Sequence, residues 1–313
     1  MLSTTKLDKD QNISPPPPER LPLARRIKYV LEYIPLRMLV WLLSVLPYKT
    51  SLFIGASLGR ITGRVIRKRY DIAKKNISGA FPTLSDARID EIIMGCWENI
   101  GAGIVDFAKI QVISKDYFFR QVDITGLENL QKAHKEGRGV VIVTAHYGSW
   151  ELAAQALPFS GFNAAVIARR VKNPYVNDLV NGIRAKNGNN VILARNGVRE
   201  SIRWLKSGNV LVILIDHRIT DGGMQIPFLG KNAYATSLPA ILGIRYNVPV
   251  LPAKCVRTAG KLSVSFGEVY DFSGLTQNEG DIYKATLQTN ETLEGWIKER
   301  PEQWLWIHNR WKT

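Results

Sequence analysis

The 313-residue sequence is poor in cysteine, with only Cys96 and Cys255. Such a pair cannot form the disulfide framework of a small secreted domain, and neither residue belongs to a CxxC or Cys/His cluster of the kind that binds zinc. Cys96 lies on the apolar face of a predicted helix and Cys255 at the end of a predicted strand. We therefore expect both to be core thiols of a protein in a reducing compartment, and we predict no metal site and no cofactor.

The sequence also lacks an apolar run long enough to cross a bilayer. A spanning helix needs roughly 20 apolar residues, and the longest run here, Met38–Leu46, is interrupted by a serine. The apolar part begins too far from Met1 for a secretory signal, and no small-residue cleavage site is evident. A secreted protein is therefore not expected.

Acidic residues are scarce near the N-terminus. Between Arg20 and Lys75 there are 13 Lys or Arg residues and only Glu32 and Asp71 to oppose them, in a chain of net charge +15. Such a surface attracts phosphates, anionic lipid head groups or an acidic carrier protein. Because aromatic and apolar side chains are interleaved with the basic ones, we expect residues 25–75 to form a helical segment that associates with the membrane interface. A buried N-terminal helical hairpin and a single tilted anchor are the alternatives.

The rest of the chain falls into two parts. Residues 1–24 contain the run Pro15–Pro18 and are expected to be a flexible tail. Residues 76–313 read as an α/β domain that opens with a capping-box pattern at Thr83–Asp86 and an amphipathic helix. Short β-branched runs then alternate with helical patterns, which predicts a mostly parallel central sheet flanked by helices. The runs are Gly139–Thr144, Ala164–Ala168, Val191–Ala194, Val210–Ile215, Val248–Val256 and Leu262–Phe266, with helical patterns at Trp150–Leu157, Pro174–Lys186 and Gly197–Lys206.

A histidine stands directly after the strand run that ends at Thr144. The carboxyl ends of parallel strands line the crevice in which α/β sheets bind ligands, so His146 is placed to meet a substrate. A neutral imidazole suits proton abstraction near neutral pH. Glu151, five residues on, is expected to fold back and hydrogen-bond the other ring nitrogen. Since no cysteine and only Ser149, an expected helix N-cap, stands nearby, the pair suggests activation of a substrate hydroxyl. A purely structural histidine is the alternative.

Four blocks in the same order resemble the lipid A biosynthesis lauroyl/myristoyl acyltransferases, which belong to the glycerolipid acyltransferase superfamily marked by His-x4-Asp/Glu. The first block is Gly137–Leu152, which contains the histidine and the glutamate. The others are Ala168–Pro174, then Leu214–Asp216 with Pro227–Gly230, and the tail Pro301–Lys312. The similarity covers roughly residues 25–312. The family usually has Asn at the place of Ser149 and often an acidic residue near Arg218.

The resemblance implies direct transfer of a fatty-acyl chain from an acyl-carrier-protein or acyl-CoA thioester to a hydroxyl of a lipid A precursor at the cytoplasmic face of the inner membrane. His146 would be the general base and Glu151 its partner. Arg184 or Arg170 would stabilise the oxyanion or contact a phosphate of the acceptor, and Asp216 would bind a substrate sugar or cap a helix. The expected partners are the acyl donor, a glycolipid acceptor and anionic membrane lipids.

Three other functions are consistent with parts of the sequence. Transfer to a phosphatidylinositol mannoside fits relatives within the same superfamily, and a thioesterase or lipid hydrolase would use His146 to activate water. A non-catalytic membrane scaffold would not need the histidine at all. A pI of 9.8 suggests nucleic-acid binding, but no recognition motif is present and we expect no nucleic-acid partner.

Overall fold

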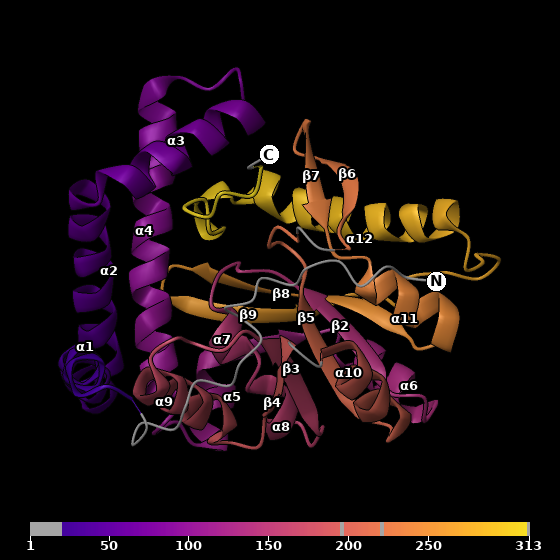
Figure 1. Cartoon of the computed structure of the whole chain (residues 1–313), viewed down its shortest axis with the longest axis horizontal. Coiled ribbons are helices and arrows are strands. Elements are labelled where there is room, and N and C mark those ends of the chain that lie inside the picture. Colours follow the sequence, from indigo (N-terminus) through magenta and orange to yellow (C-terminus); the bar gives the residue numbers. More distant parts are fainter. Residues whose placement is uncertain (1–20, 195–196, 220–221, 312–313) are drawn as a thin grey trace.

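The centre of the protein is a seven-stranded sheet in the order β1-β9-β8-β2-β5-β3-β4. The computed structural model describes residues 21–194, 197–219 and 222–311. Strands β8, β2, β5, β3 and β4 are parallel to one another, whereas β9 is antiparallel to β8 and carries β1 at the edge (Figure 1). The expected mostly parallel sheet is confirmed. The strands are β1 (Val122–Thr125), β2 (Val140–Thr144), β3 (Ala164–Ala168), β4 (Asn190–Leu193), β5 (Val210–Leu214), β8 (Val250–Thr258) and β9 (Lys261–Phe266).

Helices cover both faces of this sheet. Alternate residues of β2 point to opposite sides, so that Val141 and Val143 enter one apolar core while Val140 and Ile142 enter the other. The first core lies against helices α3, α4, α10, α11 and α12, and the second against α1, α5, α6, α8 and α9. After the N-terminal region the helices are α5 (Lys115–Gln121), α6 (Leu127–Lys135), α7 (Trp150–Ala153), α8 (Ala156–Phe159), α9 (Pro174–Ala185), α10 (Gly197–Lys206), α11 (Leu238–Tyr246) and α12 (Glu279–Glu299), followed by the 3₁₀ turn η4 (Pro301–Gln303).

The structure departs from the sequence pattern at four places. The short edge strand β1 was not expected, and neither was the antiparallel hairpin of β6 (Met224–Phe228) and β7 (Lys231–Ala235). The helix expected over Trp150–Leu157 is split into the single turns α7 and α8. The α4 cap is Ser85, whose side chain accepts a hydrogen bond from the backbone N–H of Arg88, in place of the expected capping box at Thr83.

The N-terminal region forms four helices, α1 (Leu23–Val45), α2 (Tyr48–Val65), α3 (Arg67–Ala80) and α4 (Asp86–Lys109). Pro35 lies inside α1 without ending it. In α2, Gly55, Gly59 and Gly63 are buried, and they let the α2 backbone lie directly against α4 (Figure 1). Helix α2 therefore packs on α4, which lies outside residues 25–75, and α1 and α2 do not form the buried N-terminal hairpin that was the alternative for this segment.

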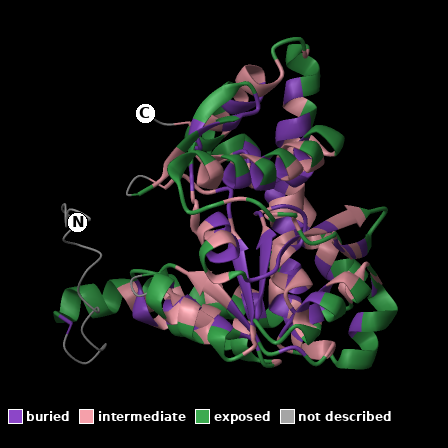
Figure 2. Ribbon diagram, turned by 90° about the vertical axis from the view of Figure 1, so that its right-hand side faces the viewer, coloured by how far each residue is buried: buried purple, intermediate pink, exposed green. Residues whose placement is uncertain are grey.

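Helix α1 has a long apolar surface that no other described part of the protein covers. Of its large apolar residues, Leu23, Leu31, Met38 and Trp41 are more than 60 % exposed. Figure 2 shows the contrast between the buried strands of the sheet and the mostly exposed helix that begins near the N label. Among the described helices none combines the length and the apolar character needed to cross a bilayer.

Two further expectations can be compared with the structure. Cys96 and Cys255 are both buried free thiols, as predicted, and burial raises the pKa of each thiol to about 12. The flexible tail expected over residues 1–24 falls mostly outside the described residues, and helix α1 already begins at Leu23.

Candidate functional site

The site is built at the carboxyl ends of two neighbouring parallel strands. Strand β2 pairs with β5 so that Thr144 lies opposite Leu214. His146 and Asp216 each come two residues after these partners, and the same register therefore brings them together although 70 residues separate them in the chain. Ligand sites of α/β sheets form at this edge because strand ends leave side chains there without a covering helix.

Asp216 is the hydrogen-bond partner of the His146 ring. Its Oδ1 lies 2.9 Å from His146 Nδ1, and its Oδ2 accepts from the His146 backbone N–H at 3.0 Å and from Trp304 Nε1 at 2.9 Å. Burial opposes the ionisation of this 2 % exposed carboxyl, but the charge and hydrogen bond of His146 and the indole N–H hold its pKa below the ordinary value. An ionised carboxylate only accepts, so Nδ1 carries a ring proton, and Nε2 is the ring nitrogen that does not contact Asp216.

From the sequence, Asp216 was expected either to bind a substrate sugar or to cap a helix. Instead it is buried, and both of its oxygens are occupied by groups of the protein itself. Its place is behind the imidazole, where an orienting carboxylate stands in triad chemistry.

Glu151 does not make the expected hydrogen bond to His146. Within the described residues its carboxylate is paired with Arg184, whose Nε donates to both carboxylate oxygens at 3.0 and 3.2 Å and whose second guanidinium nitrogen donates to Oε1. The planar guanidinium matches a carboxylate in this two-point geometry better than an imidazole does. The pair joins α7 to α9 and is partly exposed, at 19 and 23 % for the two side chains.

Two more histidines stack on the first. The His217 ring lies parallel to the His146 ring, with 4.1 Å between centroids, and the His308 ring covers the other face of His217 at 4.4 Å. Trp150 packs edge-on against His146 at 5.0 Å. Burial, together with the neighbouring charge of His146, lowers the pKa of His217 to about 4, and burial also lowers the pKa of His308. His217 is therefore a neutral platform for the imidazole at neutral pH.

The C-terminal segment holds the loop that carries the histidine. The backbone N–H of Gly148 donates to the carbonyl of Gln303 at 2.9 Å, and the N–H of Leu305 donates to the carbonyl of His146 at 3.2 Å. The Gln303 side chain also exchanges two hydrogen bonds with the Arg257 backbone in β8, at 2.9 and 2.7 Å. These contacts pair residues 146–148 with residues 303–305 like a short extra strand.

Gly148 is required where this loop turns. Its φ is +56°, and a Cβ at this position would lie 2.0 Å from the carbonyl oxygen of Cys255. Only glycine combines this conformation with so close a backbone approach. The turn directs the chain from β2 into α7, and thus places both His146 and Glu151 at the same edge of the sheet.

Of the five predicted site residues, the structure forms two pairs and leaves one apart. His146 pairs with Asp216, and Glu151 pairs with Arg184. Arg170 is exposed on the loop after β3. No group of three or more His, Cys, Asp or Glu side chains in the described ranges could hold a metal ion.

Sequence reasoning missed the roles of His217 and Trp304 at the site. The signal for His217 was its position directly after Asp216 at a strand end. The signal for Trp304 was the concentration of tryptophan and histidine in the last block. The same block also packs into the core, since Arg310 is fully buried and donates to the carbonyls of His217 and Tyr234 at 2.7 Å each.

Comparison with known proteins matches nearly the whole chain to one family. Residues 18–313 match the family described as bacterial lipid A biosynthesis acyltransferase. The chain is 26 % identical over 291 residues to a lipid A biosynthesis palmitoleoyltransferase of Escherichia coli K12, covering 91 % of this chain and 92 % of the relative. It is 23 % identical over 291 residues to a lipid A biosynthesis lauroyltransferase of the same organism, with the same shares covered. A phosphatidylinositol mannoside acyltransferase of Mycobacterium tuberculosis is 22 % identical over 244 residues, which is 76 % of each chain. The match over residues 18–313 shows that the chain belongs to the bacterial lipid A biosynthesis acyltransferase family.

Proposed function

We propose that this acyltransferase moves a fatty-acyl group from an acyl-carrier-protein or acyl-CoA thioester to a hydroxyl of a lipid A precursor, with His146 as the general base. The observation that carries the proposal is the His146–Asp216 pair at a sheet edge. The carboxylate bonds Nδ1 and so fixes the ring in orientation with Nε2 as the nitrogen that can take a substrate proton, which is the arrangement a base needs before it meets its substrate.

The chemistry is a direct transfer without a covalent enzyme intermediate. Nε2 of His146 takes the proton of the acceptor hydroxyl as its oxygen attacks the thioester carbonyl carbon. The tetrahedral oxyanion then collapses, the carbon–sulfur bond breaks, and the imidazolium returns the proton to the leaving thiolate. Asp216 stabilises the imidazolium between these two proton transfers.

Glu151 and Arg184 form the second functional pair of the proposal. Glu151 holds the Arg184 guanidinium beside α7, where its charge stabilises the oxyanion as it develops. In this role Glu151 acts through the arginine, and the base and its carboxylate are His146 and Asp216. Arg170, exposed on the next loop, contacts a phosphate of the acceptor.

We further propose that residues 25–75 attach the protein to the cytoplasmic face of the inner membrane, and that residues 76–313 form the catalytic domain. The uncovered apolar surface of α1 supports this attachment, and so do the Lys and Arg residues that flank it. Anionic lipids are then the partners of this region.

Transfer of a radiolabelled acyl group tests the assignment. We expect the full chain, incubated with labelled acyl-carrier protein and a lipid A precursor, to form labelled acyl-lipid, and His146→Gln to abolish the product. His134→Gln, a matched change on α6, is expected to leave it unchanged. Labelled free fatty acid as the only product would assign a hydrolase. A phosphatidylinositol mannoside accepted in place of the lipid A precursor would assign the alternative acceptor, which the mycobacterial relative supports.

A further inference from the structure

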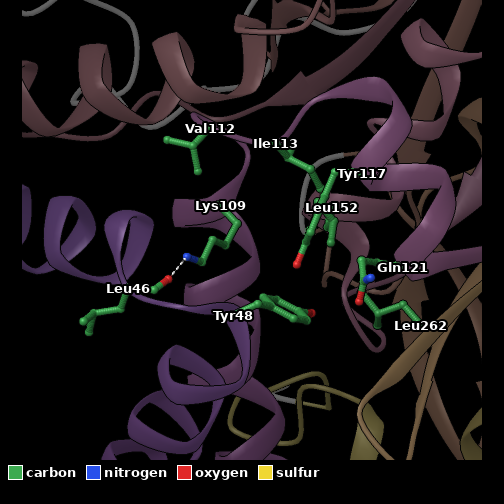
Figure 3. A pocket seen from close by; sticks show the side chains of 9 residues that line it. All are labelled: Leu46, Tyr48, Lys109, Val112, Ile113, Tyr117, Gln121, Leu152 and Leu262. Carbon is green, nitrogen blue, oxygen red and sulfur yellow. Dashed lines mark hydrogen bonds between the residues drawn. The ribbon is translucent and has the colours of Figure 1, made fainter.

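A cavity of about 250 Å³ lies between the ends of four elements. Its walls come from the α1–α2 connection, the C-terminal end of α4, α5 and strand β9, and Leu152 on α7 closes one side (Figure 3). The apolar residues that carry the argument are Leu46, Val112, Ile113, Leu152 and Leu262. The cavity is partly open to the outside, and most of its surface is apolar.

Four polar side chains line the cavity, and Lys109 and Tyr48 among them are engaged with other parts of the protein, whereas Tyr117 and Gln121 are uncharged. The Lys109 ammonium donates to the carbonyl of Ser44 at 2.8 Å and to the carbonyl of Leu46, which end α1 (Figure 3). The Tyr48 hydroxyl donates to Asp106 at 2.8 Å and accepts from Arg257 at 3.2 Å. Because the ammonium of Lys109, the one charged group of the lining, already donates to two carbonyls of the protein, the wall suits an uncharged apolar ligand better than an anion.

The cavity joins the site helix to an exposed apolar surface. Leu152 follows Glu151 directly on α7, and the same short helix carries Trp150, whose ring packs on His146. On the outer side, Val45 and Val112 are 56 and 58 % exposed, and Phe119 on α5 is 40 % exposed. The cavity wall thus includes both the exposed Val112 and Leu152 of the helix that bears the site.

We infer that this cavity binds the hydrocarbon end of a single fatty-acyl chain. The inference rests on the proposed function, because it names where the chain of an acyl substrate lies. An apolar cavity of about 150 Å³ takes up benzene, so by the same scale 250 Å³ holds on the order of ten carbons. The methylenes gain free energy from burial there, which makes the depth of the cavity a determinant of chain length.

Substitutions at Ile113 test the cavity against the donor chain. Ile113→Trp fills the space and is expected to lower kcat/KM for donors of 14 to 16 carbons about tenfold relative to donors of 8 to 10 carbons. Ile113→Ala is expected to shift the preference toward longer chains. Ile104→Trp, the same change at a 43 % exposed position of α4 outside the cavity wall, is the matched control. Unchanged chain-length preference in both Ile113 variants, together with an unchanged KM for the acceptor, would overturn the inference.

The second possible source of the chain is the acceptor lipid, which carries acyl chains of its own. If Ile113→Trp raises KM for the acceptor and leaves donor preference unchanged, the cavity binds a chain of the acceptor. Either result supports an acyl site in this cavity, and the two results assign it to different substrates.

A photo-crosslinking experiment separates this inference from the proposed function. Myristic acid with a terminal diazirine, irradiated with the full chain, is expected to label peptides within residues 109–121, and Ile113→Trp is expected to reduce that labelling at least about threefold. Labelling confined to other regions would refute the cavity assignment whatever the enzyme does. Labelling at 109–121 in a protein without transferase activity would retain the cavity and reject the proposed reaction.

Discussion

Asp216 has three N–H donors around it, and each one has a separate consequence for His146. The donor from the His146 ring fixes the tautomer, the donor from the His146 backbone fixes the start of the loop, and Trp304 holds the carboxylate itself in place. Because all three partners surround a buried anion, removal of the charge leaves donors without an acceptor. Substitution at this position therefore affects both orientation and protonation of the base.

We expect Asp216→Asn to lower kcat by roughly 100- to 10,000-fold with little change in KM, since an amide can hold the wrong tautomer of the imidazole. Steady-state kinetics with the acyl-carrier-protein donor will measure this.

Glu151→Gln and Arg184→Gln are expected to lower kcat to a similar extent as each other, because the glutamate acts through the arginine. Full activity of Asp216→Asn beside an inactive Glu151→Gln would show that Glu151 is the partner of the base after all.

The histidine stack predicts a pH dependence of stability. Folding lowers the pKa of His217 from 6.5 to about 4 through burial and the charge of His146. Between these values the unfolded chain binds the proton and the folded protein does not, so the free energy of unfolding falls as the pH drops from about 6.5 toward 4. Burial also lowers the pKa of His308, which stacks on His217, so the titration of His308 changes the free energy of unfolding in the same direction.

His217→Phe keeps a flat ring in the stack and removes this titration. Urea unfolding at pH 7 and pH 4.5 is expected to show a smaller loss of stability in the variant, by on the order of 1 kcal/mol after solvent screening. Parallel losses in the two proteins would contradict the assignment of a neutral His217.

At the scale of elements, the close pairing of α2 with α4 depends on glycine. A Cβ at Gly59 would lie 2.1 Å from the carbonyl oxygen of Trp97, and a Cβ at Gly101 would lie 2.0 Å from the carbonyl oxygen of Gly55. Neither obstacle is the end of a flexible side chain, so one helix backbone must move to admit a methyl group. This contact links the basic N-terminal region to the helix that packs on the sheet.

Gly59→Ala is therefore expected to lower the free energy of unfolding by about 1–3 kcal/mol. Gly103→Ala on α4 is the matched control, since a Cβ there meets nothing within 4 Å, and it should be neutral or slightly stabilising as a better helix former. Urea titrations monitored by circular dichroism compare the two. Equal free energies of unfolding for the two variants would show that α2 and α4 move apart without a loss of stability.

The short extra strand formed by residues 303–305 explains the last sequence block at the same scale. Its backbone bonds reach the carbonyl of His146 and the N–H of Gly148, and the Gln303 side chain ties it to β8. A tail that holds the His146 loop in place must keep its register with that loop. The block is thus part of the site as well as of the core.

For the whole molecule, the apolar surface of α1 is the basis of the proposed attachment to the membrane. Leu31, Met38 and Trp41 are 66, 64 and 62 % exposed, and exposed side chains of this size gain free energy when they enter a lipid interface. Since no other helix among the described residues covers these side chains, their replacement should leave the fold intact. Deleting the N-terminal helices instead would uncover the α4 surface against which α2 packs.

The triple change of these residues to serine is expected to lower the affinity for anionic vesicles at least about tenfold while circular dichroism stays unchanged. Co-sedimentation with phosphatidylglycerol vesicles measures the affinity. Val198→Ser with Val269→Ser, two exposed apolar positions elsewhere, serves as the control. Undiminished binding of the triple variant would exclude α1 as the membrane contact.

Local sequence determined most of the elements of this protein and the position of its proposed base. Periodicity indicated the strands β2, β3, β4, β5, β8 and β9, because side-chain alternation and β-branched residues act within a few positions. It also indicated that His146 follows a buried strand, and the order of the four blocks indicated the family that comparison then showed. Short elements such as β1 and the β6–β7 hairpin were missed because they carry too few residues for a period to be visible.

Only the tertiary structure decided which carboxylate serves the histidine. Glu151 is near in sequence, but the two-point contact with Arg184 on α9 occupies it. Asp216 is distant in sequence, and the parallel pairing of β2 with β5 brings it to the ring. The physical reason is that strand register is set by long-range packing of the sheet. The order of the strands in the sheet therefore decides which strand ends become neighbours. The spacing of residues within a sequence motif does not contain this information.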